Sequence, residues 1–222
     1  MTVRPFPTGM GAPLFDISAE CAIFASVMSV AIDSIPNIVA FVRRAWPVGD
    51  DALHMLASRL EKRIFPRRSK IVSEGRKDGK VWLVESGMTR SYWLADGQEV
   101  TTSFSIAGCV VFSMDEVYYS LPSREYVETI EPVEAYGIRT AQLMEMVESN
   151  LELCNWWRVI HQNEYRRLHQ SHKERLTLDA ANRYREFSQQ FPEVCRRARL
   201  TDIASYLGIS PATLSRIRGR IF

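Results

Sequence analysis

The sequence predicts an α+β protein in which N-terminal helices precede an antiparallel β-roll of the jelly-roll kind, one long helix and two short closing helices. Short β-rich runs separated by turn residues occupy residues 63–138, which is typical of a compact antiparallel unit. A stretch without proline or glycine covers residues 151–176, and arginines gather in residues 196–222. We therefore expect four parts, residues 1–50, 51–148, 149–176 and 177–222.

The first part is expected to be an N-terminal helical extension. An apolar segment from Ile17 to about Arg44 has the spacing of one or two helices that break near Pro36. A short amphipathic helix is predicted over residues 53–62, where leucines recur at helical intervals. Spanning a bilayer takes about 20 apolar residues, and the longest apolar run, residues 21–32, falls short of that. We expect a buried or docking helix there, no membrane contact and a cytoplasmic protein.

The second part is expected to form the β-roll. Short turn sequences separate its β-rich runs, and two of these turns contain Asp-Gly, at residues 78–79 and 96–97. Asp-Gly supplies the left-handed backbone conformation that tight hairpins need. Such regular turns favour a barrel or sandwich over alternating β and α units. The runs are KIVSEG, KVWLVESG, TRSYWLA, EVTTSFSI, CVVF, EYVETIE and VEAYGI.

A long helix is predicted over residues 151–176, after a short helix that begins at Thr140. It would extend for about 38 Å at the usual rise per residue. A helix of this length cannot bury its surface within one small domain, so we expect it to run between domains and against a second copy of the chain. The residues expected to form this dimer contact are Leu153, Trp157, Ile160 and Leu168.

The charge is distributed unevenly along the chain. Residues 196–222 hold six arginines and one acidic residue, Asp202, whereas the rest of the chain has a slight acidic excess. This segregation indicates that the C-terminal end meets a polyanion. The four cysteines are far apart and include no CxxC pair, which favours reduced cytosolic thiols over a zinc site or an iron–sulfur cluster.

Two short helices with a tight turn between them are predicted at the C-terminal end. Thr201 is the expected N-cap of the first helix, and Gly208 occupies the turn, where a residue without a Cβ is favoured. Ser210 and Pro211 are an N-cap and a residue suited to the first helical position. The residues expected to pack these helices at a steep angle are Ile203, Ala204, Leu207, Ile209, Leu214 and Ile217.

This is the helix-turn-helix arrangement, whose second helix lies in the major groove of DNA. Arginine favours bidentate contact with guanine or a firm grip on phosphate, so we expect Arg216 to contact a base edge. The structural alternative is a helical hairpin with a solvated basic face. The residues expected at the DNA interface are Thr201, Ser210, Pro211, Ala212, Thr213, Ser215, Arg216, Arg218 and Arg220.

The order of a β-rich part, a long helix and a closing helix-turn-helix resembles the Crp/Fnr family of bacterial transcription regulators. The resemblance extends over roughly residues 53–222 and is most specific in DIASYLGISPATLSRIR, VWLVESGMTRSYWLADGQEVTTSF and PSREYVETIEPVEAYGI. It implies a homodimer in which a cyclic-nucleotide-binding-like β-roll senses an effector, the long helix dimerises, and paired helix-turn-helix units bind double-stranded DNA. RNA polymerase is a further candidate partner.

The β-roll departs from the family's cyclic-AMP-binding members. The resemblance implies a Gly-Glu pair and an Arg-Ser pair around the nucleotide, but GCVVFSMDE places Phe112 and Ser113 where the first pair would be. At the second, Ser123-Arg124 is followed by Glu125, which would repel a phosphate. We therefore expect that cyclic AMP is not the effector, and the sequence specifies no cofactor.

A pocket for an unknown and largely apolar effector is a further hypothesis. Its aromatic residues are also suited to the core of the roll, and that alternative is the simpler one. The candidate pocket residues are Trp82, Tyr92, Trp93, Phe104, Phe112, Ser113 and Arg124.

The helix-turn-helix departs from the family as well. Many members have Glu at the position of Ala212, so the family's usual target sequence does not carry over. The sequence ends at Phe222, and we expect a helix-turn-helix without a full β-hairpin wing. These departures keep a second hypothesis open, a small-ligand-binding β-roll module with a weak or vestigial DNA reader.

No catalytic or metal-binding pattern stands out in the sequence. His169 and His172 have the i, i+3 spacing of two helical metal ligands, but a site would need further ligands from elsewhere. We find no Ser–His–Asp arrangement, P-loop or GxGxxG motif. We therefore expect neither an enzyme nor a resident metal.

Overall fold

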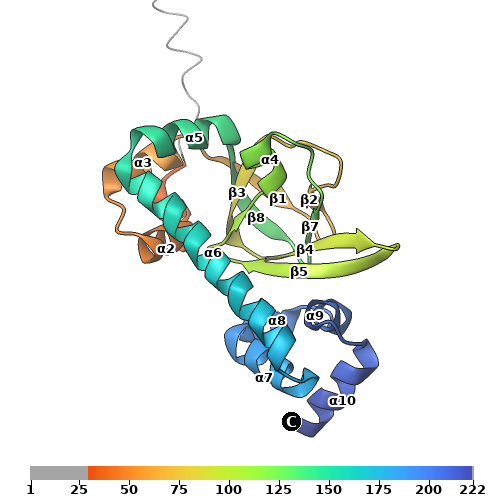
Figure 1. Ribbon diagram of the computed structural model, residues 1–222. Helices are drawn as coiled ribbons and strands as arrows, with labels where there is room; N and C mark the ends of the chain where they lie inside the picture. Colours follow the sequence, from red (N-terminus) through yellow and green to blue (C-terminus); the bar gives the residue numbers. More distant parts are fainter. Residues whose placement is uncertain (1–29, 222) are drawn as a thin grey trace, which may run out of the picture.

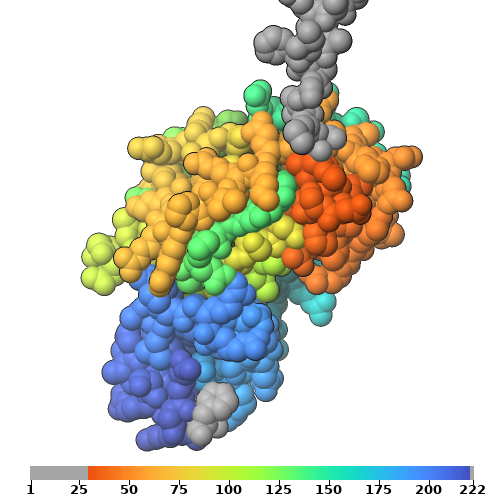
Figure 2. All heavy atoms as spheres, turned by 180° about the vertical axis from the view of Figure 1, so that it is seen from behind, coloured from red at the N-terminus to blue at the C-terminus, as the bar shows by residue number. Residues whose placement is uncertain are grey.

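The computed structural model describes residues 30–221, so predictions that concern residues before Val30 lie outside the described part. Two antiparallel sheets form a roll, helices cover one side of it, and a long helix leads from the roll to a group of C-terminal helices (Figure 1). Seen from behind, these C-terminal helices lie directly beneath the roll (Figure 2). The predicted α+β class and the order of its elements are confirmed.

Each sheet has four strands, and most neighbouring strands are remote in sequence. The first sheet has the order β1 (Glu61–Phe65), β8 (Val133–Arg139), β3 (Lys80–Ser86), β6 (Val110–Val111). The second has the order β2 (Lys70–Val72), β7 (Tyr126–Thr129), β4 (Met88–Ala95), β5 (Gln98–Ile106). All pairs are antiparallel. Because consecutive strands mostly belong to different sheets, the chain passes repeatedly from one sheet to the other, as in a β-roll.

Apolar side chains fill the interior of the roll. Trp82 packs against the backbone of Gly137, where a Cβ would lie 2.7 Å from the indole ring, so only glycine leaves room for it. The β4–β5 turn has positive φ at Asp96 (51°) and Gly97 (75°), which confirms the hairpin predicted there from Asp-Gly. The other Asp-Gly, at residues 78–79, connects β2 with β3, which lie in different sheets and do not form a hairpin. The buried cluster contains Phe65, Ile71, Val72, Trp82, Val84, Val111, Val127, Val133 and Ala135.

The N-terminal helices are tied to the first sheet. A short 3-10 turn (Ile32–Ser34) leads into α2 (Pro36–Ala45), so a helix begins at the predicted proline. The helix expected before it falls largely outside the described residues. The carboxylate of Glu85 on β3 accepts hydrogen bonds from the backbone amides of Asn37 and Ile38 at 3.1 and 3.0 Å. The start of a helix leaves such amides without intrahelical partners, and Glu85 therefore joins α2 to the sheet.

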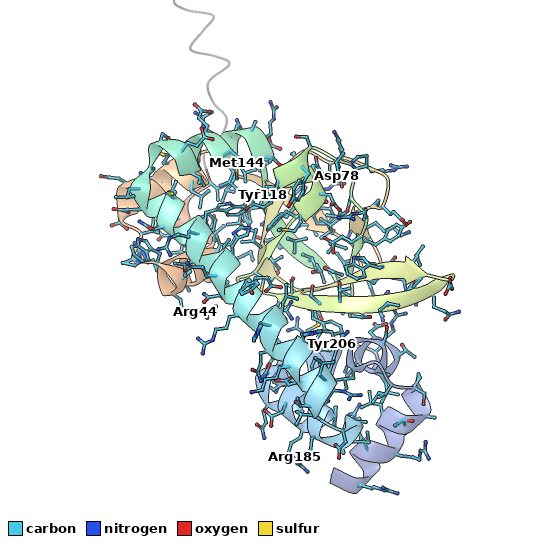
Figure 3. The ribbon with its side chains drawn as sticks, viewed as in Figure 1. Arg44, Asp78, Tyr118, Met144, Arg185 and Tyr206 are labelled. Atoms are coloured by element: carbon cyan, nitrogen blue, oxygen red, sulfur yellow. The ribbon has the colours of Figure 1, made fainter. Side chains whose placement is uncertain are left out.

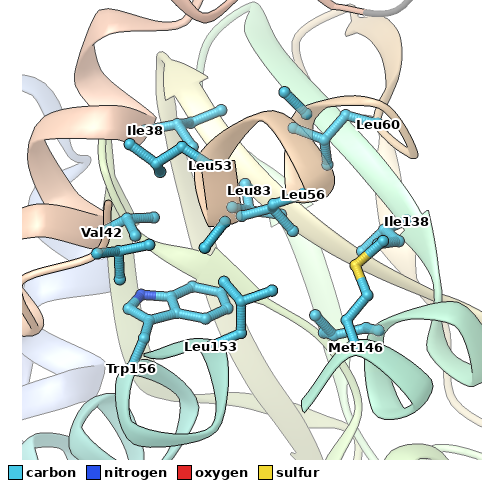
Figure 4. Close-up of a cluster of buried hydrophobic side chains, with 14 of the residues drawn as sticks. Ile38, Val42, Leu53, Leu56, Leu60, Leu83, Ile138, Met146, Leu153 and Trp156 are labelled. Atoms are coloured by element: carbon cyan, nitrogen blue, oxygen red, sulfur yellow. The ribbon is translucent and has the colours of Figure 1, made fainter. Parts of the chain in front are cut away.

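The largest core lies between these helices and the outer face of the first sheet (Figure 4). α2, α3 (Asp50–Ala57) and α5 (Thr140–Ser149) contribute to it, and the first half of α6 (Leu151–Thr177) closes it. Successive residues of β3 face opposite ways, since Leu83 belongs to this core and Trp82 to the roll interior. The N-terminal helices thus share one core with the roll.

Four elements differ from the predicted ones. The helix expected over residues 53–62 ends at Ala57, and β1 follows at Glu61. Four of the five β1 side chains are exposed, so the strand shows no apolar alternation. No pattern predicts α4 (Met114–Tyr119) or α8 (Pro192–Arg197), because each has 6 residues and is too short to show a helical period.

α6 contains 27 residues and confirms the predicted long helix. The side chain of Asn150 caps it by accepting hydrogen bonds from the amides of Glu152 and Leu153, each at 3.0 Å. α6 extends for about 40 Å and connects the roll with the C-terminal helices (Figure 1). Among the helices of residues 30–221, none is long and apolar enough to cross a membrane.

The C-terminal helices pack on the second sheet. They are α7 (Ala180–Gln190), α8, α9 (Leu200–Leu207) and α10 (Pro211–Ile221). Met88 of β4 is fully buried in the same cluster as Phe187 of α7 and Leu207 of α9. The ring of Phe104 on β5 lies 5.8 Å from that of Tyr206 on α9, between centroids. The β4–β5 hairpin is therefore part of the core of the C-terminal helices.

Candidate nucleic-acid interface

α9 and α10 form the predicted helix-turn-helix. Gly208 ends α9 with φ 66° and ψ 38°, a left-handed conformation that glycine adopts readily. The hydroxyl of Ser210 accepts a hydrogen bond from the amide of Thr213 at 3.1 Å and so caps α10, which begins at Pro211. The turn and the second cap are as the sequence predicts.

Thr201 is not the N-cap of α9, which corrects one prediction. The helix begins at Leu200, after Arg199, and Thr201 is an exposed residue of the first turn. Arg199 donates from Nε to Asp202 Oδ2 at 2.8 Å. This i, i+3 ion pair holds Arg199 against the first turn, so the helix starts earlier than a threonine cap would allow.

The six residues predicted to pack the two helices lie in one cluster. Ile203, Ala204, Leu207 and Leu214 are buried, and Ile209 and Ile217 are packed against them. Ala204 is fully buried, so its small side chain lets α9 and α10 approach each other. The packing orients α10 with its other side toward solvent.

The solvent side of α10 carries most of the predicted DNA-binding residues. Arg216 extends along it, with Nη2 3.4 Å from the hydroxyl of Thr213. Thr213 also shares a hydrogen bond of 2.9 Å with the hydroxyl of Ser210. The exposed residues are Ser210, Pro211, Ala212, Ser215, Arg216 and Arg220, and the partly buried ones are Thr213 and Arg218.

Half of the C-terminal arginines are neutralised within the chain. Arg196 pairs with Glu193, Arg197 with Glu131, and Arg199 with Asp202. The other three, Arg216, Arg218 and Arg220, form no ion pair with any described residue. The cationic surplus that the sequence spreads over residues 196–222 is therefore concentrated on α10.

A buried ion-pair network connects α9 with the β4–β5 hairpin. Arg90 on β4 donates from Nη1 to Asp202 Oδ1 at 3.0 Å and also pairs with Glu99 on β5. Its guanidinium carbon lies 4.4 Å from the centroid of the Tyr92 ring. Because Asp202 also accepts from Arg199, the carboxylate has two cationic partners.

Ser205 adds two uncharged hydrogen bonds to the same junction. Its hydroxyl accepts from the amide of Thr101 and donates to the carbonyl of Glu99, both at 2.9 Å. Both backbone groups belong to β5, the edge strand of the second sheet. No sequence pattern links Ser205 or Asp202 to these strands, since the partners are about a hundred residues apart.

The structure separates the residues predicted to form an effector pocket. Trp82 lies inside the roll, and Tyr92 stacks on an aromatic ring of β7. Trp93 is 53 % exposed near the hairpin tip. Phe104 packs against α7 and α9, whereas Phe112 packs against α6. These five aromatic residues occupy separate environments and do not line one pocket.

The two polar residues of that predicted pocket have structural partners. The hydroxyl of Ser113 accepts a hydrogen bond from the amide of Glu116 at 3.4 Å and caps α4. Arg124 holds Asp115 with two nitrogens, Nε at 3.0 Å and Nη2 at 2.7 Å. Hydrogen bonding from Arg124 lowers the pKa of Asp115, so this carboxylate remains a partner for the guanidinium.

Glu125 is a further acidic group beside this pair. Burial, and to a smaller extent the nearby Asp115 carboxylate, raises the pKa of Glu125 to about 7. The sequence indicates the charge at this position but not its burial. Asp115 already binds the guanidinium of Arg124, and Glu125 adds a negative charge once the pH exceeds about 7, so both carboxyl groups disfavour a phosphate at Arg124.

The four residues predicted to form the dimer contact divide into two groups. Leu153 (0 % exposed) and Trp157 are buried in the protomer's own core, and Ile160 packs against it. Leu168 is 51 % exposed. Leu168 is thus the most exposed of the four, because the first half of α6 covers the roll with its apolar side.

Comparison with known proteins identifies the fold. No protein-family model matches the chain, and no curated protein matches it. The solved structure of CLP, a c-di-GMP-responsive global regulator from Xanthomonas campestris, is similar with a TM-score of 0.61 and 14% identity, over 78% of this chain and 91% of that chain. FixK2 from Bradyrhizobium japonicum has a TM-score of 0.60 and 20% identity, over 73% of this chain and 84% of that chain.

The catabolite activator protein of Thermus thermophilus is similar too, with a TM-score of 0.51 and 17% identity, over 82% of this chain and 86% of that chain. At these identities the likeness concerns the fold. The chain has the Crp/Fnr-like fold, a cyclic-nucleotide-binding-type β-roll followed by a long helix and a helix-turn-helix.

Proposed function

We propose that the protein is a homodimeric, cytoplasmic transcription regulator that binds specific DNA sequences. The observation that carries the proposal is the solvent side of α10, where Arg216, Arg218 and Arg220 have no ion-pair partner among the described residues. In a helix-turn-helix, the second helix enters the major groove and the first helix holds it in place. α10, with its guanidinium groups unpaired within the described residues, is suited to the first role, and the buried α9 to the second. The regulators that share the fold support the same role.

The second half of α6 supports the homodimer. Tyr165 (72 % exposed), Leu168, His172 and Leu176 form an exposed stripe at intervals of three and four residues. Such a stripe is suited to packing against the same stripe of a second α6. A two-fold axis along α6 would present two copies of α10 to half-sites about 34–36 Å apart.

The roll would supply regulation through an effector other than cyclic AMP, or none. Arg124 is already bound by Asp115, and Glu125 adds a second carboxylate beside it, so a cyclic phosphate would find an acidic environment. RNA polymerase is a further candidate partner.

The decisive experiment is selection of bound sequences from random DNA, followed by binding measurements on the selected site and a scrambled one. Loss of a base contact costs about 1–3 kcal/mol, so Arg216→Ala should reduce the preference for the selected site roughly 5- to 150-fold. Arg185→Ala is the matched control, because it removes one exposed positive charge from α7, and it should keep the preference.

Unchanged specificity in the Arg216 variant would refute the assignment of α10 as the base-reading helix. Failure of the wild type to enrich any sequence would instead support the second hypothesis, a ligand-binding roll with a vestigial reader. Affinity should also fall steeply with salt concentration, since each neutralised phosphate releases a counterion.

A further inference from the structure

A small cavity lies where α6, α7 and α9 meet. Its volume is about 20 Å³, and its walls include Arg167, Arg175 and Arg183 together with Glu174 and Tyr206. Figure 3 shows Tyr206 beside the C-terminal half of α6. One water needs roughly 10–15 Å³ measured in this way, so the cavity has room for one small species.

Each of the three guanidinium groups is only partly satisfied by the protein. Arg167 pairs with Glu164, and Arg175 donates from Nη2 to the carbonyl of Tyr206 at 2.8 Å. Arg183 donates from Nη1 to the carbonyl of Leu178 at 2.8 Å. Its Nε is buried and has no hydrogen-bond partner among the described residues.

The charge around the cavity is not balanced. Three arginines face Glu174 in the walls and Glu164 behind Arg167, which leaves one positive charge in excess. Glu174 is also engaged, since its carboxylate accepts from Gln170 at 2.8 Å. A buried donor on a charged group is costly to leave unpaired, and charge-assisted hydrogen bonds to an anion are stronger than those to water.

We propose that this cavity binds one small monatomic anion, of the size of chloride, held by Arg183 with Arg167 and Arg175. The anion would join the end of α6 to α7 and α9, and so favour the described position of the C-terminal helices relative to the long helix. Binding of the anion and binding of DNA would then influence each other reciprocally. That consequence depends on the proposed DNA-binding function, whereas the site itself does not.

The first test compares thermal unfolding midpoints in sodium chloride and in sodium gluconate of equal ionic strength. Gluconate is too large for the cavity, so chloride should raise the midpoint of the wild type above its value in gluconate. Arg183→Gln and Arg175→Gln should abolish the difference between the two salts, even if they lower both midpoints. Arg185→Gln, which removes a charge at the lower edge of the molecule away from Tyr206 (Figure 3), should keep it.

An equal chloride effect in the Arg183 and wild-type proteins would overturn the proposal. The second test is a crystal grown in sodium bromide, which should show an anomalous peak within hydrogen-bond reach of Arg183 Nε. An ordered water with no anomalous signal at that position would also overturn it. Neither test involves DNA, so failure of the proposed function would appear separately, as absent sequence enrichment.

Discussion

Arg90 on β4 donates a hydrogen bond from Nη1 to Asp202 Oδ1 on α9 at 3.0 Å, and both side chains are buried. The roll and the helix-turn-helix are therefore connected by charges that water does not screen, in addition to the chain connection through α6. A change in the β4–β5 hairpin would reach the positioning helix directly. This contact gives the first prediction.

Asp202→Asn should destabilise the protein by about 3 kcal/mol, because it removes the buried anionic partner of Arg90 and leaves its buried guanidinium paired only with the more exposed Glu99. Urea unfolding monitored by tryptophan fluorescence would measure the loss. Asp96→Asn is the control, since Asp96 is exposed at the turn of the same hairpin and asparagine tolerates its positive φ. An equal stability of the two variants would contradict the importance of the ion pair.

The raised pKa of Glu125 predicts a pH dependence of stability. The pKa is about 7 in the folded protein, against an ordinary value of 4.5, so the folded state holds the proton over a range where the unfolded state has lost it. Stability should therefore decline as pH rises from about 4.5 through about 7, by on the order of 2 kcal/mol.

Glu125→Gln should remove this decline and be more stable than the wild type at pH 8, which unfolding experiments at pH 5 and pH 8 would show. Glu148→Gln, at an exposed position of α5, should follow the wild type at both values. A Glu125 variant with the wild-type pH profile would mean that this carboxyl group is solvated.

The exposed stripe on α6 predicts a variant that remains folded but no longer dimerises. Leu168→Asp places two carboxylates opposite each other in the paired helices and should give a monomer in analytical ultracentrifugation. Affinity for a two-fold symmetric site should fall about 10²-fold or more, because the second half-site contact is lost. Asn163→Asp, at another exposed position of α6, should remain a dimer. A monomeric wild type would refute the stripe as a contact.

The occupied Arg124 predicts that cyclic AMP does not stabilise the protein. Ligand at a hundred times its dissociation constant adds about 2.7 kcal/mol to folding, and we expect no shift of the unfolding midpoint with about 1 mM cyclic AMP beyond that seen with AMP. A specific shift with cyclic AMP would show that Asp115 releases Arg124 to the nucleotide.

Local patterns predicted most of the fold, and they did so where the signal lies in adjacent residues. The Asp96-Gly97 turn, the Ser210 cap and Gly208 each depend on the backbone preferences of one or two residues. The identity of those residues in the sequence is enough to show the preference. β1 was missed because four of its five side chains are exposed, so this edge strand has no apolar period.

The candidate site required tertiary information in two respects. The sequence could not show that Asp202 meets Arg90, because these partners come together only when α9 packs on the sheet. The i, i+3 spacing of Arg199 and Asp202 is visible in the sequence, but it does not show that Asp202 is buried. The sequence also could not distinguish the apolar residues in the first half of α6 from those in the second half. Leu153 and Leu168 have the same chemistry, and only the packing of the roll decides which one is covered.

Met88 and Phe104 have a consequence for engineering. Both come from the β4–β5 hairpin of the roll, yet they complete the core that contains Phe187 and Tyr206. A chimera that joins these C-terminal helices to a different β-roll would expose the apolar surface that Met88 and Phe104 cover. The β4–β5 hairpin would have to be transferred together with the helices. The boundary for such a chimera should therefore lie within the second sheet, before the β4–β5 hairpin, and not in the segment that follows α6.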